Sequence, residues 1–283
     1  MPQYCSKDSS VLGKLSHWLK FGGARIPSGG VFGWLGDGAF LYPEAASVLV
    51  RALLLMSDEG DLAARNLLQP VLTYLGSSVG RDGLISRDGR SYYFDSSLVL
   101  ASLKQARVSG LGGAWLGQLA RLEASIQSCE LGNGRLPGDR WSRSFGPHQL
   151  KALALLNIHS GVDVSESVSR LQSCQHPDGS FPSVPGESPI YTHAFCYALE
   201  GLLMLFGRED EGFLGGLTFL KNARLADGSF PRWLRGGSLG ICSGDVQAQL
   251  VRLFNFGGRE FEAVRDSAVD QLLTRIHATG GVE

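Results

Sequence analysis

Residues 171–205 read LQSCQHPDGSFPSVPGESPIYTHAFCYALEGLLML, and this stretch decides the predicted fold. It contains the end of one predicted helix, a turn at Asp178-Gly179, a longer loop and the start of a second helix. The Asp-Gly pair favours a tight turn, because glycine adopts a positive φ without steric cost. In the second helix His193, Tyr197 and Glu200 are spaced at i, i+4 and i+7, so they share one face of an otherwise apolar segment.

The same unit recurs along the chain. Versions of the turn begin at Asp82, Asn133, Asp178 and Asp227, roughly 50 residues apart. A fixed period of this length is typical of stacked helical hairpins, because one hairpin cannot bury its own apolar face. Degenerate copies of the turn occur at Gly29-Gly30 and Gly280-Gly281.

The apolar residues between the turns follow a helical period, and strand-like alternation is scarce. The predicted helices are 8–20, 43–57, 61–78, 93–109, 113–129, 146–160, 163–176, 192–207, 210–224, 243–257 and 259–277. Short turns alternate with long Asp-Gly loops, and loops that long in a compact domain are usually functional. The long loops therefore mark one end of the assembly as the site. A sixth inner helix is missing from this count, and its place is open, or filled by the first helix or by a partner subunit.

Composition restricts the class of protein. The 283 residues are 43% hydrophobic and 19% charged, with a net charge of −1, which argues against a nucleic-acid partner. No linker-like stretch interrupts the chain, so a single domain over 1–283 is predicted. No signal peptide and no apolar run of roughly 18 residues is recognisable. Five cysteines without close pairing indicate reduced thiols, so the expected location is cytoplasmic.

The pattern resembles the α/α toroids, in which an inner ring of helices lies within an outer ring. One group is the terpenoid cyclases and protein prenyltransferases, whose repeat places an aliphatic residue, a Gln and a Gly-containing turn that ends in an aromatic. Leu171, Gln175, Gly179 and Phe181 match that repeat. The resemblance implies a fold, while one architecture hosts many chemistries.

The sequence departs from that group where its chemistry should lie. The cyclase Asp-rich segment is absent from the predicted inner-helix starts, since Asp58-Glu59-Gly60-Asp61 falls in a short turn at the opposite end. The stretch at 143–148 lacks the Asp-x-Cys of the prenyltransferase zinc site. The chain is also similar to sugar-active toroids, namely uronate lyases and glucuronyl epimerases. Alginate-lyase-like members have six outer and five inner helices, which matches the predicted count.

Each predicted helix after a loop opens with one ionisable residue, and the set is Glu44, Asp95, His148, His193 and Asp245. Polar groups gathered at one end of a cavity can act as acids and bases. Carboxylates at helix starts also have the simpler task of capping backbone N–H groups. Histidines there are often buried imidazoles whose hydrogen bonds are satisfied, with the helix N-terminus favouring the neutral form.

Tyr191 and His193 form a second candidate pair. A Tyr and a His on either side of a sugar carbon can exchange a proton, as in lyase or epimerase chemistry. That reaction requires the uronate carboxylate to be neutralised. Arg143 and Arg232 lie on the loops at the same end, and arginine binds carboxylates in a bidentate way. The alternative is that these are ordinary solvated loop arginines.

A deeper stripe follows two turns further along the helices. Arg51, Glu200 and Arg252 each lie seven residues beyond a member of the first set, so they should lie at one depth. A structural ion-pair network is the favoured interpretation. Such a stripe makes the lumen polar, whereas an isoprenoid cavity would be lined by apolar groups.

Two loop tryptophans, Trp141 and Trp233, are suited to stacking on sugar rings or to packing the loops. A zinc site from His193, Cys196 and Cys242, with His148 as a fourth candidate, lacks the usual ligand spacing. No phosphate-binding glycine motif occurs. The sequence therefore predicts neither a metal nor a cofactor.

The sequence as a whole predicts an all-α, α/α-toroid enzyme of five to six helical hairpins acting on an anionic, uronate-type sugar by lyase, epimerase or hydrolase chemistry. The predicted catalytic residues are His193, Tyr191, His148, Asp95 and Asp245. The predicted substrate-binding residues are Glu44, Arg143, Arg232, Trp141, Trp233, Tyr197 and Glu200. The expected partner is a small-molecule or oligosaccharide substrate. The alternatives are an isoprenoid-diphosphate enzyme of the terpenoid cyclase type and a non-catalytic binding scaffold.

Overall fold

The structure is a computed structural model, and it describes residues 29–30, 41–87, 90–129, 146–183, 190–236, 240 and 243–275. The predicted helix at 8–20 lies outside these residues. Contacts divide the chain into two compact units. The first consists of Met1–Ser91, Asp95–Ser128 and Ile276–Val282, and the second of Tyr92–Phe94, Cys129–Arg275 and Glu283. Each unit is described separately below.

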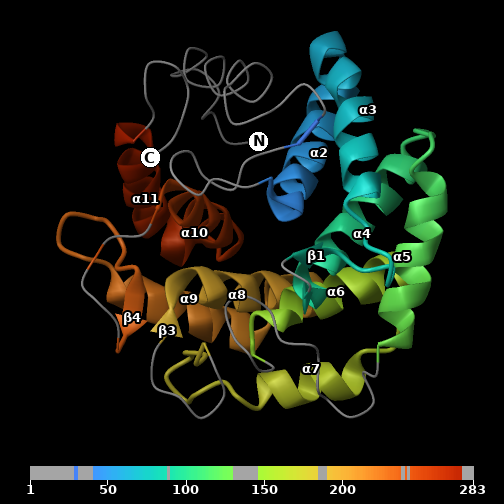
Figure 1. Cartoon of the computed structure of the whole chain (residues 1–283). Coiled ribbons are helices and arrows are strands. Elements are labelled where there is room, and N and C mark those ends of the chain that lie inside the picture. Colours follow the sequence, from blue (N-terminus) through green and yellow to red (C-terminus); the bar gives the residue numbers. More distant parts are fainter. Residues whose placement is uncertain are drawn as a thin grey trace. The chain divides into compact units, whose positions relative to one another are not determined.

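The first unit contains two helical hairpins and a small antiparallel ribbon (Figure 1). Its elements are α2 (Pro43–Asp58), α3 (Leu62–Ser77), β1 (Ser86–Arg87), β2 (Arg90–Ser91), α4 (Tyr93–Val108) and α5 (Leu116–Ser128). Helix α2 packs against α3, and the side chain of Asp61 caps α3 by accepting a hydrogen bond from the backbone N–H of Ala64. The boundary between the units falls in the first turn of α4, because Tyr93 and Phe94 belong to the second unit.

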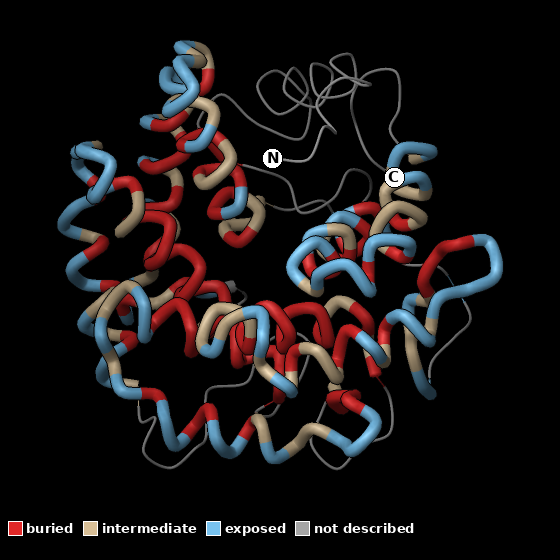
Figure 2. The backbone as a smooth tube through the Cα atoms, turned by 180° about the vertical axis from the view of Figure 1, so that it is seen from behind, coloured by how far each residue is buried: buried red, intermediate tan, exposed pale blue. Residues whose placement is uncertain are grey.

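The second unit contains the remaining hairpins. Its elements are α6 (Gln149–Ser160), α7 (Ser165–Gln172), β3 (Ile190–Tyr191), α8 (Thr192–Phe206), α9 (Glu211–Ala223), β4 (Trp233–Arg235), α10 (Gly244–Phe256), the 3₁₀ turn η2 (Arg259–Phe261) and α11 (Glu262–Thr274). Helix α8 packs between α6 and α10, and α11 packs on α10. Figure 2 shows α8 buried along most of its length, whereas α7 and α9 expose one face. This difference distinguishes inner from outer helices.

The helical prediction is confirmed for the described part of the chain, where most predicted helix boundaries are within about three residues of the observed ones. Helix α7 is the shortest α-helix among the described residues, because it ends at Gln172 and the chain then turns through Cys174 and Gln175. The four short strands were not predicted. Two or three residues give too short an alternation to recognise in a sequence.

The Asp-Gly turns share one structural role. Within each unit the turn glycine lies against the next outer helix, where an added Cβ would come within 2.0–2.4 Å of another atom. The contacts pair Gly83 with Ser125, Gly179 with Gly215, and Gly228 with Ser267. Each of these glycines has φ between 82° and 86°, a region that residues with a Cβ rarely adopt. The repeat therefore places glycine where the chain needs both a left-handed turn and close contact with a neighbouring helix.

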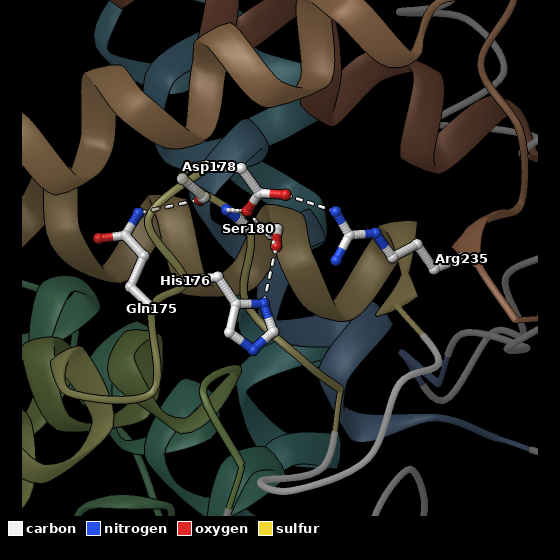
Figure 3. Close-up of polar contacts among 6 residues, drawn as sticks. Gln175, His176, Asp178, Ser180 and Arg235 are labelled. Carbon is white, nitrogen blue, oxygen red and sulfur yellow. Dashed lines mark hydrogen bonds and ion pairs between the residues drawn. The ribbon is translucent and has the colours of Figure 1, made fainter.

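The aspartate of each turn stabilises the loop locally. Asp178 accepts hydrogen bonds from the backbone N–H and hydroxyl of Ser180, as Asp227 does from Ser229. These are Asx turns, which short acidic side chains favour. Figure 3 shows that the second carboxylate oxygen of Asp178 is paired with Arg235, and that Gln175 contacts the turn. The hydrogen bond from Ser180 is the largest cause that lowers the pKa of Asp178.

Gln175, which precedes the turn, also has a structural role. The side-chain amide of Gln175 donates to the backbone carbonyls of Gly179 at 3.0 Å and Gly212 at 2.7 Å. It thus joins the turn to the first turn of α9. In the next repeat Arg224 stands at the Gln position, and Gln271 of the following helix, α11, donates to the carbonyl of Asp227 in the turn. The Asp-Gly motif is therefore explained by packing between successive hairpins.

Candidate functional site

The starts of α8 and α10 form the candidate site in the second unit. Two consecutive long loops pair here, since β3 is antiparallel to β4 with Tyr191 opposite Trp233. Thr192, the first residue of α8, donates from its backbone N–H to the carbonyl of Arg232 and from its hydroxyl to the carbonyl of Pro231. These bonds fix the residues on either side of Thr192, namely Tyr191 and His193, against the β4 loop.

His193 lies between aromatic rings and close to the carboxylate of Asp245. Its ring centroid lies 4.5 Å from that of Tyr197 and 6.2 Å from that of Tyr191. Its Nδ1 atom lies 3.9 Å from Oδ2 of Asp245, which is an ion pair when the imidazole is protonated. The His193 side chain is 12% exposed, against 65% for Asp245. The imidazole is thus both held in place and accessible, as a proton-transfer group must be.

Aromatic side chains continue from His193 across the loop pair. The Tyr191 ring lies 5.0 Å from the Trp233 ring, and the Arg232 guanidinium carbon lies 5.9 Å from the Tyr191 ring centroid. Tyr191 and Trp233 are both partly exposed. A sugar ring or another flat apolar face can stack on such a surface.

A buried ionic cluster lies two helical turns below His193. Oε2 of Glu200 is 2.5 Å from Nζ of Lys151, and its Oε1 is 3.3 Å from Nη1 of Arg252. The Glu200 side chain is 1% exposed. The Lys151 ammonium also lies over the Tyr197 ring, 4.3 Å from its centroid. Since His193–Asp245 and Glu200–Arg252 both pair, α8 and α10 present matching faces in register.

The charge state of Glu200 follows from these contacts. Burial by itself would raise the pKa of the Glu200 carboxyl. The charges of Lys151 and Arg252, together with the hydrogen bond from Lys151, outweigh burial and hold that pKa below its ordinary value. Glu200 is therefore a carboxylate at neutral pH.

His148 is packed in the interior of the second unit. It is 2% exposed, and its ring lies 6.0 Å from that of Phe94, which in turn lies 4.8 Å from the Tyr197 ring. Its Nε2 atom lies 3.2 Å from the side-chain nitrogen of Gln149. An aromatic chain thus connects His148 to His193, while burial separates His148 from solvent.

The structure brings together only some of the predicted residues. Those in the second unit that adjoin one another are His193, Asp245, Tyr191, Tyr197, Glu200, Trp233 and Arg232. Glu44 and Asp95 are both buried in the first unit, on α2 and α4, and their part in a site remains a prediction. Arg143 and Trp141, and also Cys242, lie outside the described residues.

Sequence reasoning missed Lys151 as a site residue. It also did not recognise Arg252 and Gln249 as residues that can bind a substrate. Lys151 lies three residues after His148 within an apolar helix, and a lysine at such a position is seldom buried unless paired. That isolated position was the only available signal. Its partner Glu200 is 49 residues away in sequence, beyond the reach of any local pattern.

Among the described residues, no group of three or more His, Cys, Asp or Glu side chains is arranged to hold a metal ion. In the same part of the chain, no helix is both long and apolar enough to cross a membrane.

Several solved structures share this fold, among them the following two. A cellobiose 2-epimerase from Bacillus thermoamylovorans B4167 matches 94% of this chain and 86% of its own, with a TM-score of 0.69 and 13% identity. A protein from Actinoplanes matches 96% of this chain and 82% of its own, with a TM-score of 0.62 and 16% identity. No protein-family model matches the chain, and neither does any curated protein sequence.

These similarities identify the class of fold. The chain has the all-α fold of the α/α toroids, as its repeat predicted. At 13% and 16% identity the similarity concerns the fold alone.

Proposed function

We propose that the chain is a carbohydrate-active enzyme in which His193 moves a proton at a sugar carbon. The observation that carries this proposal is the position of His193. It is accessible, paired with Asp245 at 3.9 Å, and flanked by the partly exposed rings of Tyr191 and Trp233. The fold shared with a cellobiose 2-epimerase supports carbohydrate chemistry of this kind.

The proposed reaction begins at a carbon next to a carbonyl or carboxylate group. The His193 imidazole takes the proton from that carbon, and the electron pair moves onto the neighbouring oxygen. A proton returned to the opposite face of the carbon gives the epimer, with Tyr191 as the partner proposed from the sequence. If a leaving group on the next carbon departs instead, the product is an alkene, which is lyase chemistry. Asp245, exposed beside His193, can orient the imidazole or act as the acid of a hydrolase.

The finer proposal is an acidic, uronate-type substrate. A carbanion beside a carboxylate is tolerable only when that carboxylate is neutralised. Arg232 lies over the Tyr191 ring and is exposed, so it is available for this purpose. A hydrophobic isoprenoid substrate is disfavoured, because Lys151, Glu200 and Arg252 make the interior of the second unit ionic below His193.

The test is hydrogen exchange in deuterated water. The protein is incubated with neutral and uronate-containing saccharides, and NMR follows deuterium entering the sugar. We expect exchange with the wild type and a decrease of about 10²- to 10⁴-fold in His193→Asn, the range for losing a general acid–base group. The matched control is His159→Asn. His159 lies in the last turn of α6, so this variant should retain full exchange. Equal exchange in His193→Asn and the wild type would exclude His193 as the proton-transfer group, and no exchange in the wild type would exclude this function and leave a binding scaffold.

A further inference from the structure

The ionic cluster below His193 carries more positive than negative charge. Glu200 provides one carboxylate, and two cations, Lys151 and Arg252, pair with it. Among the described residues no second carboxylate lies within salt-bridge distance of either cation. Glu200 balances the buried charge of Lys151, which would otherwise be costly to remove from water. One positive charge of this cluster therefore lacks a protein partner in the described part of the chain.

Of the two cations, only Arg252 is exposed to solvent. Lys151 is buried, with its ammonium between Glu200 and the Tyr197 ring. The Arg252 side chain is 50% exposed and makes a single ion pair, at 3.3 Å. A guanidinium has five N–H donors in a planar fork suited to carboxylate or phosphate. Most of the donors of Arg252 thus remain available to a ligand.

A second polar group lies beside Arg252. Gln249 is three residues before Arg252 and four after Asp245, so all three share one face of α10. The side-chain oxygen of Gln249 is buried and has no hydrogen-bond partner among the described residues. An unsatisfied buried acceptor costs free energy until a donor reaches it. A sugar hydroxyl is a donor of the right kind.

We infer that Arg252 binds an acidic group on the sugar unit next to the reacting one, with Gln249 accepting a hydrogen bond from a neighbouring hydroxyl, whereas Arg232 serves the carboxylate of the reacting unit. This inference rests on the proposed function and deepens it. Seven residues of helix place Arg252 about 10 Å from Asp245 along α10. The acidic group would then lie well inside the site, on the sugar unit next to the reacting one. Arg232, predicted from the sequence, lies instead at the β4 loop beside Tyr191.

The experiment compares binding of matched saccharides by thermal shift and calorimetry. The probes are a uronate-containing disaccharide, neutral cellobiose and inorganic phosphate. We expect the uronate to bind more tightly than cellobiose to the wild type. Arg252→Gln should weaken uronate binding about 10- to 100-fold, as the loss of a charged hydrogen-bonded contact does, and leave cellobiose binding unchanged. Arg252→Lys should be intermediate, because lysine keeps the charge without the planar fork.

Two controls separate the possible outcomes. Arg208→Gln removes a well-exposed arginine and should change nothing. His193→Asn should retain Arg252-dependent binding of the uronate while losing proton exchange.

If the wild type shows that binding but exchanges no proton, the anion site stands and the proposed reaction fails. Uronate binding of equal strength in Arg252→Gln and the wild type overturns the inference, as does a preference for cellobiose. Phosphate binding that depends on Arg252 and exceeds that of the uronate assigns the site to phosphate and overturns the uronate assignment.

Discussion

At the scale of single residues, Glu200 determines the charge inside the second unit. Its carboxylate is shared by Lys151 and Arg252 and has almost no contact with solvent. Removing one member of a buried ion pair typically costs about 3–5 kcal/mol, because the remaining charge stays buried without compensation. Glu200→Gln should therefore lower the free energy of unfolding at pH 7 by about that amount, as measured by urea titration.

The same substitution should act in a pH-dependent way. The pKa of Glu200 in the folded protein lies below its ordinary value of 4.5, so its ionised form stabilises the fold above about that pH. The stabilisation is lost as the pH falls through the folded-state pKa. The stability difference between wild type and Glu200→Gln should therefore shrink in acid. Glu123→Gln, which breaks the more exposed pair with Lys104, is the control and should cost under about 1 kcal/mol. A deficit of equal size at neutral and acidic pH would contradict this account.

At the scale of elements, the contact between α6 and α8 depends on Gly201. A Cβ at this position would come within 2.4 Å of the Leu150 carbonyl carbon and 2.5 Å of the Lys151 nitrogen. Both are backbone atoms, which cannot move without displacing the helix. The approach of the two helices also brings Lys151 within 2.5 Å of Glu200. Gly201 thus connects helix packing with the ionic cluster.

Gly201→Ala should separate α6 from α8. We expect the free energy of unfolding to fall by about 1–3 kcal/mol, the usual cost of overpacking, and uronate binding to weaken as the cluster shifts. The control is Gly215→Ala in α9, where the nearest atom to an added Cβ is 3.6 Å away. That substitution has room and should be neutral, or stabilise by up to about 1 kcal/mol, because alanine favours the helix. Chemical denaturation of the two variants in parallel gives the comparison. Equal effects would show that the contact at Gly201 is not tight.

At the scale of the whole molecule, the question is whether the two units unfold together. The sequence predicts one domain, and α4 is shared, since its first two residues belong to the second unit and the rest to the first. A helix divided in this way should couple the units, because its first turn cannot be lost without fraying the remainder.

We therefore predict one cooperative unfolding transition. Trp115 reports on the first unit and Trp233 on the second. With fluorotryptophan incorporated, NMR resolves the two side chains during a urea titration. Coincident midpoints are expected for a single domain. Midpoints that differ beyond experimental error would mean two independently stable domains.

The sequence by itself determined the helices, their pairing into hairpins and the class of fold. These depend on local features: apolar periodicity, and an Asp-Gly turn that only glycine can make where it packs on the next helix. It also determined that His193, Tyr197 and Glu200 share a face, because residues three or four apart in a helix are neighbours.

Only the tertiary structure decided which residues meet across helices. The partners of Glu200 come from α6 and α10, and those of Tyr191 from a strand more than forty residues away. These contacts depend on the register of whole elements, which no local pattern encodes. A shift of one turn along α10 would bring Gln249, rather than Arg252, to the level of Glu200. The charge of the site is therefore a property of packing, and it is decided by how closely α6, α8 and α10 approach.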